Sequence, residues 1–228
     1  MKAADIMTPS VVTITDDATV NEAAEQMLKY RISALPVVDC NGKLVGIISE
    51  GDLVRRAEVG TQRERPWWLE LLTSKRRLAA EYVRSHAHTI RDVMRRNVIT
   101  AAPETPISEV ARLLEIHAIK RVPITDGDKL VGIVSRANVM QGVASLEAKA
   151  SPSSSTSPSN RAIRESILET VKTAPWCPSL WNVTVSNGVV DLWGVTESLE
   201  EKQAVGTTAE NTPGVVLVRN NLVVAVRS

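Results

Sequence analysis

Two segments of the chain repeat one another at a nearly constant offset, and this repeat restricts the folds open to the sequence. Asp5-Ile6-Met7 corresponds to Asp92-Val93-Met94, which lies 87 residues later. A turn in the second copy is one residue shorter, so Gly46 then matches Gly132 at an offset of 86. Each copy has about 55 residues, which is too few to bury a core well. We therefore expect the two copies to pack on each other.

Within each copy, the apolar pattern predicts a strand, a helix, two strands and a second helix. In the first copy a short strand ends before 16–17, and Thr19 is placed to cap the helix that follows. A strand over 35–38 leads into Asp39–Gly42, where Asn-Gly favours a hairpin with positive φ angles, and then into a strand over 44–48. The expected apolar face of the helix consists of Val20, Ala23, Ala24, Met27 and Leu28.

The last strand of each copy enters a helix through a polar pair. Ser49 and Asp52 form this pair in the first copy, and Ser135 and Asn138 form it in the second. The pair fits a helix cap, in which Ser accepts a backbone N–H and Asp favours the positive end of the helix dipole. It also fits a ligand site, because free N–H groups and a hydroxyl bind phosphate while a carboxylate accepts from ribose hydroxyls. The residue types alone leave both interpretations open.

A third unit follows a Ser/Pro-rich stretch at 147–160, which has the composition of a flexible linker. Residues 161–228 predict a helix, a hairpin turning at Asn187-Gly188, a second helix over about 197–210, and further strand sequence after Pro213-Gly214. The predicted order is αββαβ. The apolar face of its first helix consists of Ile163, Ile167, Leu168 and Val171.

These residues resemble two known families. Asp-Ile/Val-Met, Ala-Leu-Pro-Val-Val-Asp and Leu-Val-Gly-Ile-Ile/Val-Ser are similar to the cystathionine-β-synthase (CBS) domain, and two copies in tandem resemble a Bateman module. The pattern Val-x-Val-x-x-Gly-x-Val-x-Leu-x-Gly, followed by Pro-Gly-Val, resembles a BON domain. The resemblance implies an α+β fold with two βαββα CBS repeats, at 1–60 and 89–146, packed as a pseudo-symmetric pair. A small αββαβ BON domain at 161–228 completes it.

The CBS resemblance implies an adenosine nucleotide such as AMP, ADP or ATP in one or both clefts. In that family the repeated turn binds ribose and phosphate, and the strand before the first helix and the residues around Pro enclose the base. We expect firmer ribose binding at Asp52 than at Asn138, because a charged acceptor makes stronger hydrogen bonds. Arg31 and Arg136 are further candidates for phosphate, although each also fits a solvated surface residue. The candidate nucleotide-binding residues are Val12, Thr13, Ala34, Leu35, Pro36, Ser49 and Asp52 in the first copy, and Thr100, Lys120, Arg121, Pro123, Ser135 and Asn138 in the second.

Residues 61–88 belong to neither copy and carry more basic than acidic side chains, together with Trp67 and Trp68. An amphipathic helical insertion that packs on the CBS core or on a second subunit explains them. The less favoured alternative is a basic, Trp-bearing surface that contacts a membrane or a partner.

Composition and motifs exclude several other functions. The net charge of +1 gives no reason to expect nucleic acid as a partner. Cys40 and Cys177 fit no metal-ligand spacing, and we find no P-loop or nucleophile motif, so we expect no metal, no cofactor and no enzyme activity. The first nine residues lack the apolar stretch of a signal peptide and no window suits a membrane span, so we expect a cytoplasmic protein.

We therefore expect a non-catalytic regulatory protein for signal transduction that binds an adenine nucleotide and relays its state to the BON domain or a partner. The CBS resemblance also implies a homodimer. The alternative is a structural adaptor without a nucleotide ligand, peripheral at the membrane, whose BON domain contacts phospholipid or protein.

Overall fold

The computed structural model describes residues 1–54, 88–146 and 158–225, which fall into two compact units. One unit contains residues 11–99 and 127–130, and the other contains residues 1–10, 100–126 and 131–228. The predicted basic insertion at 61–88 and the predicted linker at 147–160 lie almost wholly outside the described residues.

The first repeat has the predicted order of elements. Thr19 caps α2 as expected: its hydroxyl accepts the Glu22 N–H at 3.2 Å, and the Glu22 carboxylate accepts the Thr19 N–H at 2.7 Å. β1 runs parallel to β2, and β2 runs antiparallel to β3. The elements are β1 (Ile14–Thr15), α2 (Val20–Lys29), β2 (Ala34–Val38), β3 (Leu44–Ser49) and α3 (Glu50–Leu53).

Two local predictions in this repeat are wrong. Leu28 is 79% exposed, so the buried face of α2 is narrower than predicted and consists of Val20, Ala23 and Met27. In the Asn-Gly hairpin only Gly42 has a positive φ angle, 77°. Asp39 accounts for the difference, because its carboxylate accepts the N–H groups of Asn41 and Lys43 and so stabilises a turn in which Asn41 keeps an ordinary φ.

The second repeat has the same order, except that its first strand is reduced to a single bridge between Ala101 and Ile124. Its two main strands, β4 and β5, pair with each other. The elements are α6 (Ile90–Val93), α7 (Ile107–Ile116), β4 (Arg121–Asp126), β5 (Lys129–Ser135) and α8 (Arg136–Leu146).

Each repeat's core contains the short helix that precedes the other repeat. Ile6 of α1 (Ala3–Ile6) is fully buried with residues of the second repeat, while Ile90 of α6 is fully buried with residues of the first. The exchange explains the glycine in each last strand. A Cβ on Gly46 would lie 2.5 Å from Met94 Sδ, and a Cβ on Gly132 would overlap Met7 in the same way. Repeats too small to bury a core are thus completed by exchanged helices.

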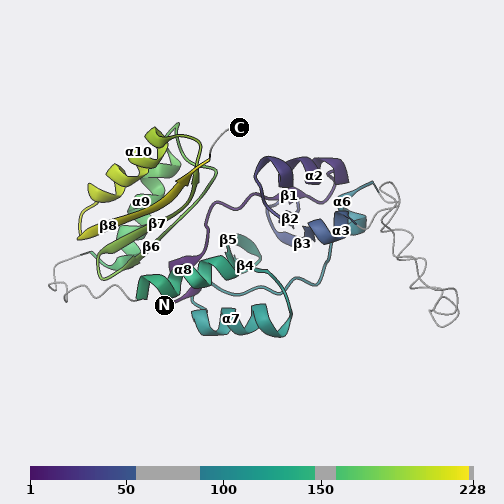
Figure 1. Ribbon diagram of the computed structural model, residues 1–228. Coiled ribbons are helices and arrows are strands. Elements are labelled where there is room, and N and C mark those ends of the chain that lie inside the picture. The colour runs from purple at the N-terminus through teal and green to yellow at the C-terminus, as the bar shows by residue number, and fades with distance from the viewer. Residues whose placement is uncertain (55–87, 147–157, 226–228) are drawn as a thin grey trace, which may run out of the picture. The chain divides into compact units, whose positions relative to one another are not determined.

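The C-terminal domain has the predicted αββαβ order. Its sheet has the strand order β6-β7-β8, with β6 antiparallel and β8 parallel to β7, and α9 and α10 pack against the sheet (Figure 1). The hairpin is confirmed, with φ angles of 51° at Asn187 and 75° at Gly188. The elements are α9 (Asn160–Lys172), β6 (Leu180–Ser186), β7 (Val189–Thr196), α10 (Leu199–Glu210) and β8 (Leu217–Val224).

Candidate functional site

The polar pair of the first repeat is joined by hydrogen bonds at the turn from β3 into α3. The N–H and the hydroxyl of Ser49 both donate to Asp52 Oδ2, at 3.0 and 2.6 Å. Ala34 lies opposite Ser49 in the β2–β3 register, and the Glu50 N–H donates to the Ser33 carbonyl at 3.1 Å. The start of β2, where the base-enclosing residues were predicted, therefore lies at this turn.

Arg95 occupies the other oxygen of the same carboxylate. Its Nε and Nη2 donate to Asp52 Oδ1 at 3.1 and 3.0 Å. Its backbone exchanges two hydrogen bonds with Ile47 of β3, at 2.9 and 3.0 Å, which fixes where the side chain starts. The Asp52 side chain is 15% exposed and that of Arg95 is 60% exposed, so the ion pair borders solvent.

The polar pair of the second repeat is more deeply buried. The Ser135 N–H and hydroxyl donate to Asn138 Oδ1 at 2.8 and 2.6 Å, as at the first turn. The Asn138 Nδ2 group donates to Thr8 Oγ1 and to Gln141 Oε1, both at 3.4 Å. Asn138 is 5% exposed. Its amide therefore uses both its acceptor and its donors within the protein.

Sequence reasoning missed Arg95, Thr8 and Gln141. The repeat offset was a signal for two of them: Thr8 and Arg95 each directly follow the repeated Asp-Ile/Val-Met, 87 residues apart. Both residues bond to the polar pair of the repeat whose core their helix joins. Gln141 had no such signal, because it lies one turn beyond Asn138 on an ordinary helix face.

The other predicted site residues lie around these turns in their own units. Ile14 is paired with Val37, so the Val12-Thr13 segment leads up beside β2. The Ala101 N–H donates to the Pro123 carbonyl at 3.2 Å, which places Thr100 beside β4. Ala34, Leu35, Pro36 and Pro123 are buried, Val12, Thr13 and Arg121 are half-buried, and Thr100, Lys120, Arg31 and Arg136 are exposed. Their role in ligand binding stays a prediction.

Within 1–54, 88–146 and 158–225, no three or more His, Cys, Asp or Glu side chains are grouped so that they could hold a metal ion. Cys40 and Cys177 are exposed free thiols. None of the helices in the described part of the chain has the length and apolar character needed to cross a bilayer.

Two repeats with exchanged helices and paired polar turns, followed by an αββαβ domain, define a modular α+β protein. The family model of the CBS domain matches residues 3–58 and 90–145, and that of the BON domain matches residues 159–226. The chain belongs to the CBS-domain family and carries two CBS domains followed by a BON domain.

Similar proteins fall into two groups. The uncharacterized protein MJ1426 of Methanocaldococcus jannaschii is 34% identical over 152 residues, covering 61% of this chain and 89% of that protein. The homoserine O-acetyltransferase of Methanococcoides burtonii is 31% identical over 137 residues, but the match spans 60% of this chain and only 23% of the enzyme. Because so little of the enzyme is matched, its activity is not carried over to this chain.

One of the similar solved structures contains a bound ligand. CBSX2 of Arabidopsis thaliana in complex with AMP superposes with a TM-score of 0.56 and 25% identity, covering 64% of this chain and 98% of that one.

Proposed function

We propose that this chain is a non-catalytic regulatory protein that binds an adenosine nucleotide, of the AMP, ADP or ATP type, at its CBS repeats. The observation that carries the proposal is the repeated turn, where a serine orients an oxygen acceptor, Asp52 or Asn138. At the first turn this acceptor lies beside the start of β2, the strand that carries the predicted base-enclosing residues. The AMP complex of the similar protein CBSX2 supports the choice of ligand class.

The first site has the groups that a ribose phosphate needs. Asp52 Oδ1 accepts two N–H donors, and the two hydroxyls of a ribose can supply donors to the same carboxylate. Arg95, released from Asp52, then offers its guanidinium to phosphate, which it binds well because its planar fork matches phosphate oxygens. The Arg95 end of this ion pair is exposed to solvent, so exchanging the pair for the ligand costs less than breaking a fully buried pair.

The second site has a neutral pair in the same place. Asn138 offers an amide to the ribose, and the residue that corresponds to Arg95 is Thr8, which carries no charge. Neutral hydrogen bonds are about half as strong as charged ones. We therefore expect the second site to bind the nucleotide more weakly than the first.

Calorimetric titration of the full chain with AMP, ADP and ATP tests the proposal. We expect Asp52→Ala to weaken binding at the first site by about tenfold to a hundredfold, because hydrogen bonds to a charged group contribute about 1.5 to 3 kcal/mol. Glu50→Ala is the matched control, since it removes an equal and exposed negative charge two residues away. Equal affinities in the wild type and in Asp52→Ala would show that the ribose assignment is wrong.

One observation favours a second function, that of an adaptor acting through the BON domain. Val195 of β7 is paired with Val223 of β8, and the two are 39% and 63% exposed. Leu217, also on β8, is 53% exposed. Adjacent exposed apolar side chains suit contact with a phospholipid surface or a protein. Co-sedimentation with liposomes tests it: Val223→Asp would release the chain from the vesicles if these residues make the contact.

A homodimer remains part of the proposal. Met140 and Val143 on α8 are three residues apart and are 72% and 56% exposed, so they lie on one face of the helix as adjacent apolar side chains that a second copy could cover. Light scattering of the full chain tests this, with Met140→Lys and Val143→Lys as variants that a dimer through α8 would not tolerate.

A further inference from the structure

The BON domain packs on the second CBS repeat within one compact unit. Residues Trp181–Val185 of β6 are all buried, although side chains alternate between the two faces of a strand. Val183 and Val185 join the core beneath α9 and α10. Asn182 and Thr184 point the other way and bond to residues of the second repeat and α1. The outer face of β6 is thus an internal docking surface.

Two BON side chains hold the end of α1. Arg164 is 5% exposed, and its Nη2 donates to the Met7 carbonyl at 2.6 Å while its Nε donates to Val183 O within the BON domain. Asn182 Nδ2 donates to the Ile6 carbonyl at 2.8 Å. The last carbonyls of a helix lack intrahelical partners, and a cation is favoured at that end. Burial lowers the pKa of Arg164 to about 10, so it keeps its charge at neutral pH.

The same contacts reach the second candidate site by two routes. Thr8 follows Met7 directly and accepts from Asn138 Nδ2. Gln141 Oε1 accepts both from Asn138 Nδ2, at 3.4 Å, and from Asn182 Nδ2, at 3.3 Å. One glutamine side chain therefore bonds to the candidate ribose acceptor and to the docked BON domain at once.

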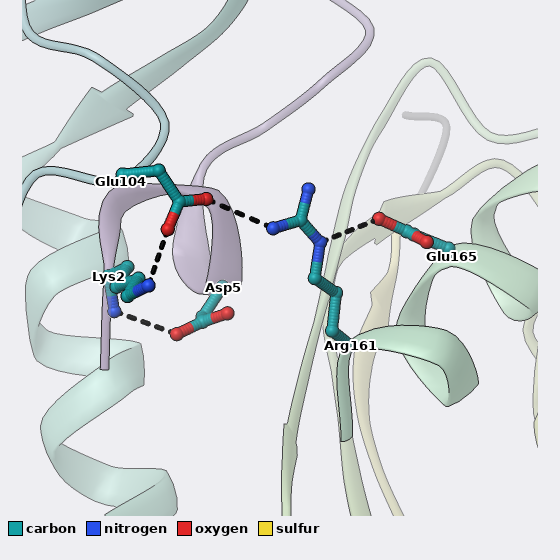
Figure 2. Close-up of polar contacts among 5 residues, drawn as sticks. All are labelled: Lys2, Asp5, Glu104, Arg161 and Glu165. Atoms are coloured by element: carbon teal, nitrogen blue, oxygen red, sulfur yellow. Dashed lines mark hydrogen bonds and ion pairs between the residues drawn. The ribbon is translucent and has the colours of Figure 1, made fainter. Parts of the chain in front are cut away.

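A further hydrogen bond and an ion-pair cluster surround this network. Ser145 Oγ of α8 and Thr184 Oγ1 lie 2.7 Å apart, and both residues are fully buried. At the surface, Glu104 bonds to Lys2 and, through Oε1 at 3.0 Å, to Arg161 of α9 (Figure 2). These surface charges are more than half exposed, so solvent and salt screen them. The buried groups rather than the surface cluster are expected to hold the dock.

We propose that docking of the BON domain through Arg164 and Asn182 orders the second site, so that the docked domain and a ligand at Asn138 stabilise each other. α1 has four residues, far fewer than an isolated helix needs for stability. Without Arg164 and Asn182, which donate to the Met7 and Ile6 carbonyls, the segment through Thr8 loosens. Asn138 then loses Thr8 as a hydrogen-bond partner. The part of this inference that concerns the ligand rests on the proposed function. Because binding linkage is reciprocal, docking must raise the ligand affinity by the same factor by which the ligand raises the docking equilibrium.

Amide hydrogen exchange of the ligand-free full chain tests the structural half. The Thr8 N–H donates to the Ile133 carbonyl at 2.9 Å, and the Ile133 N–H donates to the Thr8 carbonyl at 3.0 Å. We expect both amides to exchange about tenfold faster in Arg164→Met, which breaks charged hydrogen bonds, and about threefold faster in Gln141→Ala. The equivalent amides, Arg95 and Ile47, lie in the other unit and should not change.

Two controls keep the test decisive. Arg161→Ala removes a surface cation from the same helix and should leave the Thr8 and Ile133 amides unchanged. If Arg164→Met unfolds the BON domain, seen as loss of protection at Val190, then Gln141→Ala decides, because Gln141 lies outside that domain. Unchanged exchange at Thr8 and Ile133 in Gln141→Ala and in a folded Arg164→Met would overturn the inference.

Titration with AMP tests the ligand half. In an Asp52→Ala background, which leaves the second site, adding Arg164→Met should weaken AMP binding several-fold, because the apparent affinity falls with the fraction of chains in which the Thr8 segment is ordered. Equal AMP affinity with and without Arg164→Met would contradict the coupling. If the wild type binds no AMP at either site, the proposed function fails and mutual stabilisation with a ligand fails with it. The exchange experiment then still decides whether docking orders the Thr8 segment.

Discussion

Arg95 donates Nε and Nη2 to a single oxygen of Asp52, at 3.1 and 3.0 Å, whereas its counterpart Thr8 accepts from Asn138 at 3.4 Å. The first repeat thus pairs a carboxylate with a guanidinium at its turn, and the second repeat pairs an amide with a hydroxyl. Each pair satisfies its own hydrogen bonds, so the difference between the turns extends over two positions and not one. The first site is therefore charged and the second is neutral.

Arg95→Ala should change the preference of the first site among adenosine compounds. The substitution frees Asp52 for ribose and removes a cation from the place expected for phosphate. We expect affinity for adenosine to hold or rise while affinity for AMP falls, so that their ratio shifts by about fivefold, the effect of roughly 1 kcal/mol between charges in water. Calorimetry with both compounds measures the ratio. An unchanged ratio would mean that Arg95 does not meet the phosphate.

Gly194→Ala should strongly destabilise the BON domain. Gly194 has a φ angle of 133°, and an added Cβ would collide with the Leu180 carbonyl and lie 2.6 Å from Trp181 Cα. We expect a loss of about 3 kcal/mol in the free energy of unfolding, measured by urea denaturation. Gly42→Ala is the control, since Gly42 has a φ angle of 77° and no atom within 4 Å of a Cβ. It should lose only about 1 kcal/mol. Equal losses in the two variants would show that no collision occurs at Gly194.

Thr19→Ala should weaken the first repeat by removing the cap of α2. The hydroxyl that accepts the Glu22 N–H is lost, and such caps contribute about 1 kcal/mol. Thermal unfolding measures the change. Thr19→Ser keeps the hydroxyl and should restore most of the stability. If Ser and Ala lowered the unfolding temperature equally, the hydroxyl would not be the stabilising group.

Glu104 should make stability fall in acid. The hydrogen bond from Lys2, followed by that from Arg161, lowers the pKa of Glu104 below its ordinary value of 4.5. A carboxyl with a lowered pKa adds stability above its unfolded pKa, and this is lost as the pH falls through its folded pKa. Urea unfolding of the wild type and of Glu104→Gln should be compared from about pH 2 to pH 7. The difference between their free energies of unfolding should shrink to nothing in acid. A difference that is constant with pH would exclude a charge effect.

The elements that could be predicted from sequence are those whose signal is local. Thr19 and Glu22 form a capping box within one turn, and Asn187-Gly188 determines its hairpin through two positive φ angles. The polar pairs at the two turns were found because Ser and Asp or Asn are also close in sequence. For each of these the hydrogen-bonded partners are at most a few residues apart.

The features that were missed depend on contacts between distant segments. Arg95 reaches Asp52 across 43 residues, and Arg164 reaches Met7 across 157. A charged residue next to Ile163 on an amphipathic helix would be placed in solvent by pattern alone, yet Arg164 is buried because α1 supplies a carbonyl for it. The prediction for Leu28 fails in the opposite direction, because Leu28 was expected to be buried and is exposed. Its apolar character could not show that, among the described residues, no element covers that side of α2.

Binding of an adenosine nucleotide by the CBS repeats is tested most directly by thermal unfolding of the full chain with added AMP, ADP or ATP. A nucleotide at about 100 times its dissociation constant should add about 2.7 kcal/mol to the free energy of unfolding, and Asp52→Ala should lose most of that gain. An unfolding temperature that stays the same at millimolar concentrations of all three nucleotides would contradict the claim.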